Sequence, residues 1–369
     1  MKEIPLFKVH MPESVREPLN NVLFSGFIGQ GPKVEEFERV LSEYFENSNT
    51  LSLNSGTSAI HLALRLANIG PGDEVITTPM TCTATNMPIM ATGAKMVWAD
   101  IDPVTGLICP DSIKSKITNK TKAIVMVHFG GIPCRIDEIN EIAKSKNIYT
   151  IEDAAHSFGS SYKNKRIGNH SDFVIFSFQA IKHITTVDGG LLITKRREDY
   201  DRGKLLRWYG IDRETPRKDF RCEENIHEYG YKFHMNDICA CIGIEQMRHA
   251  DKIIGAHMKN ATFYDNKLKN LKTIDLIPKH ANSESASWLY TIHVKNRDKF
   301  MSFMSENKVS TSKVHERNDI HDAFLDAQSS LPGVDKFCET QVSIPVGWWL
   351  SSEDLNRISS LILEFDKNN

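Results

Sequence analysis

One lysine in this chain has the setting in which an amine can do covalent chemistry. Lys182 follows an apolar, strand-like run over residues 172–178 and precedes a small polar turn that closes on Gly189 and Gly190. Burial at the end of a strand lowers the pKa of an amine and frees its lone pair to form a Schiff base. Because most lysines are solvated, a surface lysine in a loop is the alternative. The residues that accompany Lys182 must decide between the two.

Two acidic residues end another buried strand. Residues 148–153 form an apolar run that closes on Glu152 and Asp153. Neighbouring residues of a strand point to opposite faces, so we expect one carboxylate at the carboxyl edge of the sheet. A buried carboxylate needs a cation or strong donors, and a structural arginine is one alternative partner. Asp153 precedes Lys182 by 29 residues, which is enough for a strand–turn–strand excursion that returns both to one edge.

A run of small residues supplies a third feature. Residues 53–61 read Leu-Asn-Ser-Gly-Thr-Ser-Ala-Ile-His and lead directly into an apolar helix. The amides and dipole of such a helix N-terminus bind phosphate, although an ordinary N-cap by Ser55 or Thr57 gives the same pattern. A phosphate cradle, an acid and a buried lysine on strand ends together match pyridoxal phosphate. That cofactor needs an amine for its aldehyde, a carboxylate for its ring nitrogen and a phosphate anchor.

The elements that position these residues alternate between strands and helices. Strand-like runs cover residues 74–77, 95–99, 123–127, 148–151, 173–176 and 190–194. Helix-like segments lie between them, including residues 58–68 and residues 136–146, which carry apolar side chains at helical spacing. Near-continuous apolar strands separated by helices predict an α/β fold with a mostly parallel sheet covered on both faces. Ligands of such sheets bind beyond the carboxyl ends of the strands.

The C-terminal third differs in pattern. We expect one long helix from Asn236 to about Leu268, followed by a strand over residues 288–294 and helices near residues 298–307 and 352–365. This mixture predicts a smaller α+β domain. The expected division is a large cofactor-binding domain over residues 1–245 and a small C-terminal domain over residues 246–369.

Bulk properties exclude several classes of function. With a formal net charge of −2, we expect no overall electrostatic attraction of the chain to nucleic acid or to an anionic membrane. The chain has no run near the roughly 18 apolar residues that span a bilayer, and Pro5 with early charges interrupts any signal peptide, so we expect a cytoplasmic protein. Without a C-x-x-C pair, we expect no metal site and no disulfide framework. The cysteines are scattered at Cys82, Cys109, Cys134, Cys222, Cys239, Cys241 and Cys338.

Several segments together resemble a known family. They are residues 29–38, 54–59, 70–75, 127–128, 152–155 and 177–190, and the last two motifs are the most specific. The chain is similar in these segments to the DegT/DnrJ/EryC1/StrS family of fold-type-I pyridoxal-phosphate enzymes, chiefly aminotransferases acting on nucleotide-linked keto sugars. The resemblance implies L-glutamate or glutamine as amino donor, a keto-bearing sugar nucleotide as acceptor, and a homodimer whose active sites are completed by the partner chain.

The resemblance also implies roles for residues of this sequence. Lys182 would form the Schiff base with the cofactor and then move the proton, and Asp153 would pair with the ring nitrogen. The phosphate would be held by Thr57, Ser58 and Ser177. His156 would lie near the ring or its 3-hydroxyl.

The sequence departs from the family pattern on the substrate side. Cys82 occupies the place of an aromatic that stacks on the cofactor ring. Lys232 replaces an asparagine at the phosphate and could still hold it as a cation. His234 replaces an arginine, which makes the charge at that place dependent on pH. In the segment 313–319, His315 and Arg317 could face the substrate, or the segment could be a solvated polar loop.

These departures leave other functions open. The acceptor could be a small phosphorylated ketone, and a non-catalytic regulator of the same fold is a different class. Dehydratases of the family carry histidine in place of the lysine, so an intact Lys182 favours amination over dehydration. A DNA-binding role would need a basic face, and a dinucleotide-binding module would need a G-x-G-x-x-G turn after an early strand.

Overall fold

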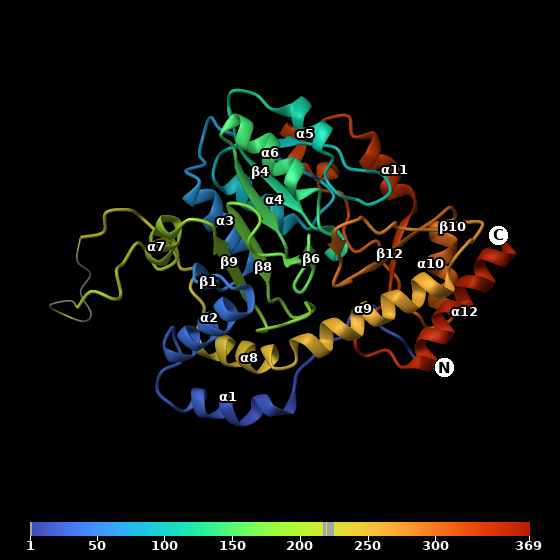
Figure 1. Cartoon of the computed structure of the whole chain (residues 1–369), viewed down its shortest axis with the longest axis horizontal. Coiled ribbons are helices and arrows are strands. Elements are labelled where there is room, and N and C mark those ends of the chain that lie inside the picture. Colours follow the sequence, from blue (N-terminus) through green and yellow to red (C-terminus); the bar gives the residue numbers. More distant parts are fainter. Residues whose placement is uncertain (1, 217–218, 220–224) are drawn as a thin grey trace.

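The computed structural model describes residues 2–216, 219 and 225–369, so Cys222 lies outside the described residues. Over these residues the central sheet has the strand order β1-β9-β8-β5-β4-β2-β3 (Figure 1). The strands are β1 (Thr50–Leu53), β2 (Glu74–Thr77), β3 (Lys95–Trp98), β4 (Thr121–Val127), β5 (Tyr149–Asp153), β8 (Phe173–Ser177) and β9 (Gly190–Thr194). β9 runs antiparallel to β1 and β8, whereas the pairs from β8 to β3 are parallel. The expected mostly parallel sheet is confirmed.

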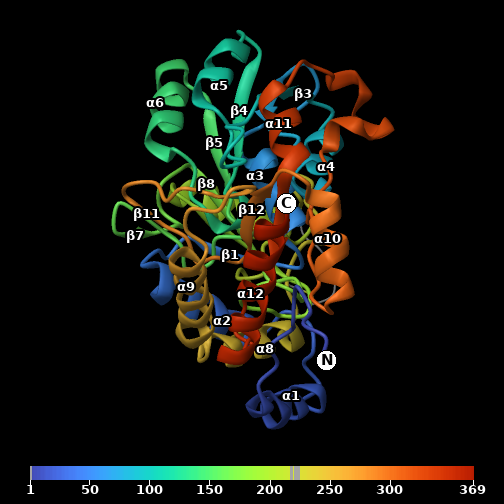
Figure 2. The same cartoon turned by 90° about the vertical axis from the view of Figure 1, so that its right-hand side faces the viewer.

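Helices cover both faces of the sheet. Figure 2 shows α5 and α6 on one side and α3 and α4 on the other. The helices of this part are α1 (Arg16–Leu23), α2 (Pro32–Phe45), α3 (Gly56–Leu66), α4 (Thr83–Ala91), α5 (Pro110–Lys116), α6 (Ile136–Lys146) and α7 (Arg197–Leu206). The apolar side of α6, with Ile136, Ile139 and Ile142, is buried against the sheet core, as its periodicity predicts.

The predicted long helix over residues 236–268 is wrong. Two helices, α8 (Asp237–Met247) and α9 (Ala250–Lys267), follow each other and are separated at Arg248 and His249. His249 has φ −108° and ψ 0°, which departs from ideal α-helix angles, and the chain forms a turn there. Apolar residues continue across the break without a glycine or proline, which is why the pattern reads as one helix.

The C-terminal residues build a second, smaller layer around a sheet of order β10-β12-β13 (Figure 1). Its elements are β10 (Ile274–Leu276), β12 (Tyr290–Val294), β13 (Gln341–Ile344), α10 (Arg297–Glu306), α11 (Pro332–Thr340) and α12 (Ser352–Asn368). Ile292, Phe300 and Ile358 lie in its hydrophobic core. Ile4 belongs to the same core and its backbone bridges Val309, so the first residues of the chain pack against the last unit. The α+β character of this unit agrees with the expected fold class.

Short elements complete the fold. β6 (Ser161–Tyr162), β7 (Lys165–Arg166) and β11 (Ser283–Glu284) form a small antiparallel sheet that joins the two layers. The 3₁₀ turns are η1 (Glu13–Val15), η2 (Phe129–Gly131), η3 (Asn318–Ile320) and η4 (Asp322–Ala327). Within the described part of the chain, no helix is both long and apolar enough to cross a bilayer.

Candidate active site

Lys182 lies in the loop after β8, at the carboxyl edge of the sheet. Its backbone N–H donates to Gln179 O at 3.0 Å in a tight turn, and its Nζ lies 3.8 Å from the centroid of the Trp288 ring. Burial lowers the pKa of the amine to about 8, while the nearby Asp153 and Cys82 oppose this by favouring the ammonium form. A substantial fraction of the amine is therefore unprotonated near pH 8, as a nucleophile or proton acceptor requires.

Asp153 ends β5 at the same edge and is buried. Its Oδ2 accepts a hydrogen bond from Thr85 Oγ1 at 2.6 Å, and its Oδ1 accepts one from Ala155 N at 3.1 Å. The Oγ1 atoms of Thr81 and Thr85 are 2.8 Å apart, so Thr81 donates to the hydroxyl that donates to Asp153. The partners of this carboxylate are hydroxyl and amide donors near an amine, instead of a structural arginine. The sequence patterns did not single out Thr85, which lies in the first turn of α4.

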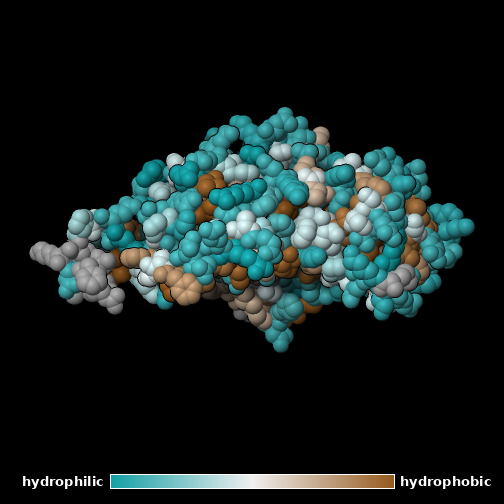
Figure 3. All heavy atoms as spheres, turned by 90° about the horizontal axis from the view of Figure 1, so that it is seen from below, coloured by the Kyte–Doolittle hydropathy of each residue, from teal (hydrophilic) through white to brown (hydrophobic). Residues whose placement is uncertain are grey.

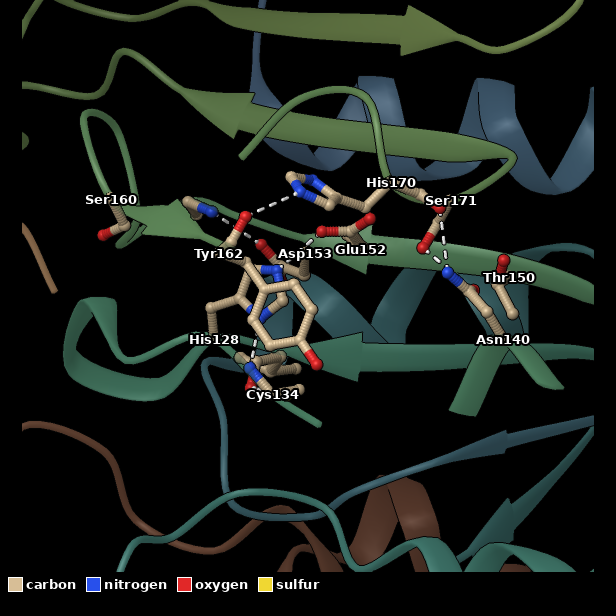
Figure 4. Close-up of polar contacts among 12 residues, drawn as sticks. His128, Cys134, Asn140, Thr150, Glu152, Asp153, Ser160, Tyr162, His170 and Ser171 are labelled. Carbon is tan, nitrogen blue, oxygen red and sulfur yellow. Dashed lines mark hydrogen bonds and ion pairs between the residues drawn. The ribbon is translucent and has the colours of Figure 1, made fainter. Parts of the chain in front are cut away.

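Glu152 points to the opposite face of β5, as alternation predicts (Figure 4). Its Oε2 lies 2.8 Å from His128 Nε2, and both side chains are fully buried. The backbone N–H of Cys134 donates to His128 Nδ1 at 3.1 Å. Because Nδ1 accepts, the neutral imidazole carries its proton on Nε2 and donates it to Glu152. Through this contact, Glu152 links β5 to His128 at the end of β4, on the face of β5 opposite to Asp153.

The N-terminus of α3 meets the end of β8. Ser55 caps the helix by accepting a hydrogen bond from Ser58 N at 3.0 Å. A Cβ at Gly56 would lie 3.1 Å from Ser177 Cβ, so glycine allows this close approach. Thr57, which is exposed, Ser58 and Ser177 therefore gather around the first amides of the helix, which have no intrahelical partner. Capping by Ser55 therefore does not prevent the amides of this first turn from binding an anion.

His156 is buried between aromatic rings. Its ring stacks on Trp288, with centroids 4.0 Å apart and an interplanar angle of 28°. Gly130 N donates to His156 Nδ1 at 3.3 Å, which places the proton of the neutral ring on Nε2. Burial first, and then the nearby Lys182 and His315, hold the pKa of His156 well below its ordinary value. His156 is thus a neutral donor through Nε2 at physiological pH.

The structure brings His315 to the site but not Arg317. The rings of His315 and His156 are nearly parallel, at 9°, with centroids 5.4 Å apart. Burial, with Lys182 as the second cause, lowers the pKa of His315 to about 4, and its buried Nε2 has no hydrogen-bond partner among the described residues. Arg317 instead forms ion pairs with Asp319 and Asp335.

Asn318 explains why the segment 313–319 is ordered instead of a solvated loop. Its Nδ2 donates to Thr81 O at 2.8 Å, its Oδ1 accepts from Asn86 Nδ2 at 2.8 Å, and its backbone N–H donates to Pro79 O. These bonds dock the loop of His315 on the start of α4. An asparagine in a polar stretch carries no signal of such a role in the sequence.

Lys232 and His234 lie along the end of β1. Asn54 N donates to Phe233 O at 2.7 Å, and the side chain of Lys232 is exposed. The His234 ring packs on Trp208 with centroids 3.5 Å apart. Burial first, and then neighbouring cations such as Arg213, lower the pKa of His234 to about 4. The expected dependence of this charge on pH therefore falls near pH 4, well below neutrality.

Cys82 is half-buried at the N-cap of α4 and close enough to Lys182 to influence the pKa of the amine. The aromatic side chain that the structure places on Lys182 is Trp288 at the start of the C-terminal unit. The apolar pattern of residues 288–294 predicts only a strand at this tryptophan. Its role has no local sequence signal, because the contact joins residues more than a hundred positions apart.

Comparison with known proteins agrees with this geometry. The sequence model of the DegT/DnrJ/EryC1/StrS aminotransferase family matches residues 10–363. The chain belongs to this family. The recognised family and the expected enzyme class, an aminotransferase, are confirmed, and pyridoxal phosphate is the cofactor of the family.

Relatives of this aminotransferase extend over most or all of its length. GDP-perosamine synthase from Escherichia coli O157:H7 is 37% identical over 73% of each chain. The crystal structure of the sugar aminotransferase CalS13 from Micromonospora echinospora is 34% identical, covers 98% of this chain and 99% of its own, and has a TM-score of 0.95. The PLP form of the sugar aminotransferase Spr1654 from Streptococcus pneumoniae is 28% identical, covers 100% and 99%, and has a TM-score of 0.91.

The residues of this family member fit the cofactor. The structure offers a half-buried lysine of lowered pKa, Lys182, a carboxylate held by two donors at Asp153, and helix amides beside Ser177. The buried Nε2 of His315, which has no hydrogen-bond partner in the described part of the chain, leaves a polar atom for a bound group. Each of these groups matches one chemical need of pyridoxal phosphate.

Proposed function

We propose that this aminotransferase moves the amino group of L-glutamate or glutamine to a keto group of a nucleotide-linked sugar. The observation that carries the proposal is the half-buried Lys182 amine, of pKa about 8, beside the buried carboxylate of Asp153. When bound, pyridoxal phosphate supplies an electron sink for the carbon from which the proton leaves. The sugar acceptor is supported by GDP-perosamine synthase and CalS13, whose names state sugar products or substrates.

The residues would divide the work by their chemistry. Lys182 would bind the aldehyde carbon and then hold and move the proton, because its amine is unprotonated in part near neutral pH. Asp153 would keep the ring nitrogen protonated. Thr57, Ser58 and Ser177 would bind the phosphate at the N-terminus of α3.

Two imidazoles would orient the remaining groups. The Nε2–H of neutral His156 would donate to the 3-hydroxyl, since its Nδ1 already accepts from Gly130. The unpartnered Nε2 of His315 would meet a polar group of the substrate. Both rings exclude water from the amine, which strengthens the electrostatic attraction of Asp153 for a cation.

The first test is spectroscopic. Purified protein loaded with pyridoxal phosphate should be yellow, and its visible absorption should bleach when L-glutamate or glutamine is added. A keto sugar nucleotide should then restore the colour, whereas a small phosphorylated ketone that does so instead would move the acceptor to that class. Glutamate, glutamine and alanine all leaving the spectrum unchanged would defeat the amino-transfer proposal. Restoration of colour is the readout that separates an enzyme from a regulator that only binds the cofactor.

We further propose a homodimer in the cytoplasm. Phe24 and Phe27, between α1 and α2, are 83% and 74% exposed, which is unusual for large apolar side chains. Figure 3 shows hydrophobic patches on the hydrophilic surface of the α1 side. Lys232, exposed on its own chain, would reach the phosphate of the partner's site. Light scattering tests the dimer: replacement of both phenylalanines by serine should give monomers that have lost activity, and an unchanged mass would contradict this interface.

A further inference from the structure

Trp288 holds Lys182 through two independent contacts. Its indole N–H donates to the carbonyl oxygen of Ile181 at 2.9 Å, and its ring centroid lies 3.8 Å from Lys182 Nζ. The first contact fixes the backbone from which the lysine side chain starts. The second contact fixes the position of the Nζ atom, by a cation–π interaction when the amine is protonated.

The indole is itself held in place. It is buried, it stacks on His156 at 4.0 Å, and it stacks on Phe7 with centroids 5.1 Å apart and an interplanar angle of 22°. A ring packed against two other rings can shift little without disturbing its neighbours. Trp288 is therefore a rigid support for a long, otherwise flexible lysine side chain.

We propose that Trp288 is a positioning residue for amino transfer, which holds the Lys182 amine where it must meet the cofactor. This inference rests on the proposed function, because it concerns the reaction that Lys182 carries out. Cys82 stands where the family pattern has an aromatic, so this chain has one aromatic fewer at that place. Trp288 brings an aromatic face from the C-terminal unit, and that face meets the Lys182 amine.

The same contact affects the protonation of Lys182. The indole excludes water from one side of the amine, which disfavours the charged form, whereas its π face favours that form. Burial is the largest influence on the pKa of Lys182, so loss of the ring should let water in and raise that pKa.

Tryptophan variants separate the two contacts. Trp288→Phe keeps a ring but loses the hydrogen bond to Ile181, and Trp288→Leu loses both. Trp349→Phe is the matched control, because the indole N–H of Trp349 also donates to a backbone carbonyl, Pro5 O at 3.2 Å, while its ring packs edge-on against His257 instead of on Lys182. We expect kcat to fall about tenfold in Trp288→Phe and roughly 100-fold in Trp288→Leu, with the KM for the amino donor within about twofold, because small displacements of a reacting group cost rate.

A second readout does not depend on activity. Lys182 in the apo-protein is labelled with an amine reagent between about pH 6 and about pH 10, and its labelling is measured by peptide mapping. The midpoint should move upward in Trp288→Leu, less in Trp288→Phe, and not in Trp349→Phe. Should Trp288→Leu fail to fold, Trp288→Phe decides, since it conserves most of the ring volume.

The two readouts distinguish the possible failures. If both Trp288 variants match Trp349→Phe in kcat and in labelling midpoint, Trp288 does not position the lysine. If instead the wild-type protein does not respond to any amino donor, the proposed function is wrong. In that case the labelling midpoints still show whether Trp288 controls the Lys182 amine.

Discussion

The two ends of the candidate site differ in how the fold holds them. At the Lys182 end, Asp153 ends a buried strand and His156 follows it, and both accept hydrogen bonds from within the core. At the Lys232 end, the segment that carries His234 lies along the edge of β1, and Lys232 is exposed. Burial and hydrogen bonds fix the Asp153 and His156 side chains at the first end, whereas the Lys232 side chain at the second end is exposed. We therefore expect the chemistry at the first end and contacts with substrate or partner at the second.

Among the variants that compare the two ends, removal of the Lys182 amine should have the largest effect on kcat. Lys182→Ala should lower kcat by about 10⁴-fold or more, because both the covalent and the proton-transfer roles are lost. Steady-state kinetics with L-glutamate measures it, and borohydride trapping should no longer label the peptide around residue 182. Lys232→Ala is the companion variant from the other end. Equal losses in the two variants would remove the distinction between the ends.

The two faces of β5 give the next comparison. Asp153→Asn should lower kcat by roughly 10²–10³-fold, because a preorganised charge at the reacting group is lost. Glu152→Gln should change kcat little but lower the free energy of unfolding by about 1–3 kcal/mol, because a hydrogen bond of the buried His128 loses its charged partner. Denaturant titration and kinetics on both variants measure the two effects. A Glu152 variant with the larger catalytic loss would reverse the assignment of the faces.

Thr85 tests how far Asp153 depends on its support. Thr85→Val should lower kcat roughly tenfold, because a hydrogen bond to a charged group contributes about 1.5–3 kcal/mol, and this bond is 2.6 Å long. The matched control is Thr83→Val in the same first turn of α4. Binding of pyridoxal phosphate should weaken in the Thr85 variant alone. Identical cofactor affinity and kcat in the two variants would show that the Ala155 amide is enough for Asp153.

His234 should give the smallest effect. With a pKa lowered to about 4, chiefly by burial, this imidazole is neutral between pH 6 and pH 8 and gains its proton only as the pH falls toward 4. His234→Gln should therefore leave the shape of the pH–rate profile unchanged in that range. His234→Arg, which carries a permanent charge, is the control. A shift of the profile in the glutamine variant would mean that His234 titrates near neutrality.

Much of the fold was predictable because its strands are short apolar runs between helices with clear periodicity. β1 was not predicted as a strand, because its four residues, Thr50–Leu53, form a short run that leads directly into the small-residue turn. The break between α8 and α9 was missed because Arg248 and His249 are compatible with a helix, and only tertiary packing turns the chain there. The division at residues 245 and 246 stays a prediction.

The site was predictable where chemistry and strand ends coincide, as at Lys182 and Asp153. The residues that support these two side chains were not predictable. Thr85, Asn318 and Trp288 act through side chains that approach from other elements, and Asn318 contacts residues more than 200 positions away. A single sequence records residue types and local period, but these contacts depend on how the loops of the small unit close over the sheet edge.

The packing of Ile4 has a consequence for the way this chain is made and handled. Its side chain fills the core of a unit whose other residues are synthesised last, and the carbonyl of Pro5 accepts the indole N–H of Trp349. A C-terminal fragment alone therefore lacks part of the core of the small unit. During synthesis, the N-terminal residues can pack into this core only after the C-terminal residues have been made. Trimming the first few residues should leave a hole far from the cut in sequence, so an affinity tag is better carried after Asn369 than before Lys2.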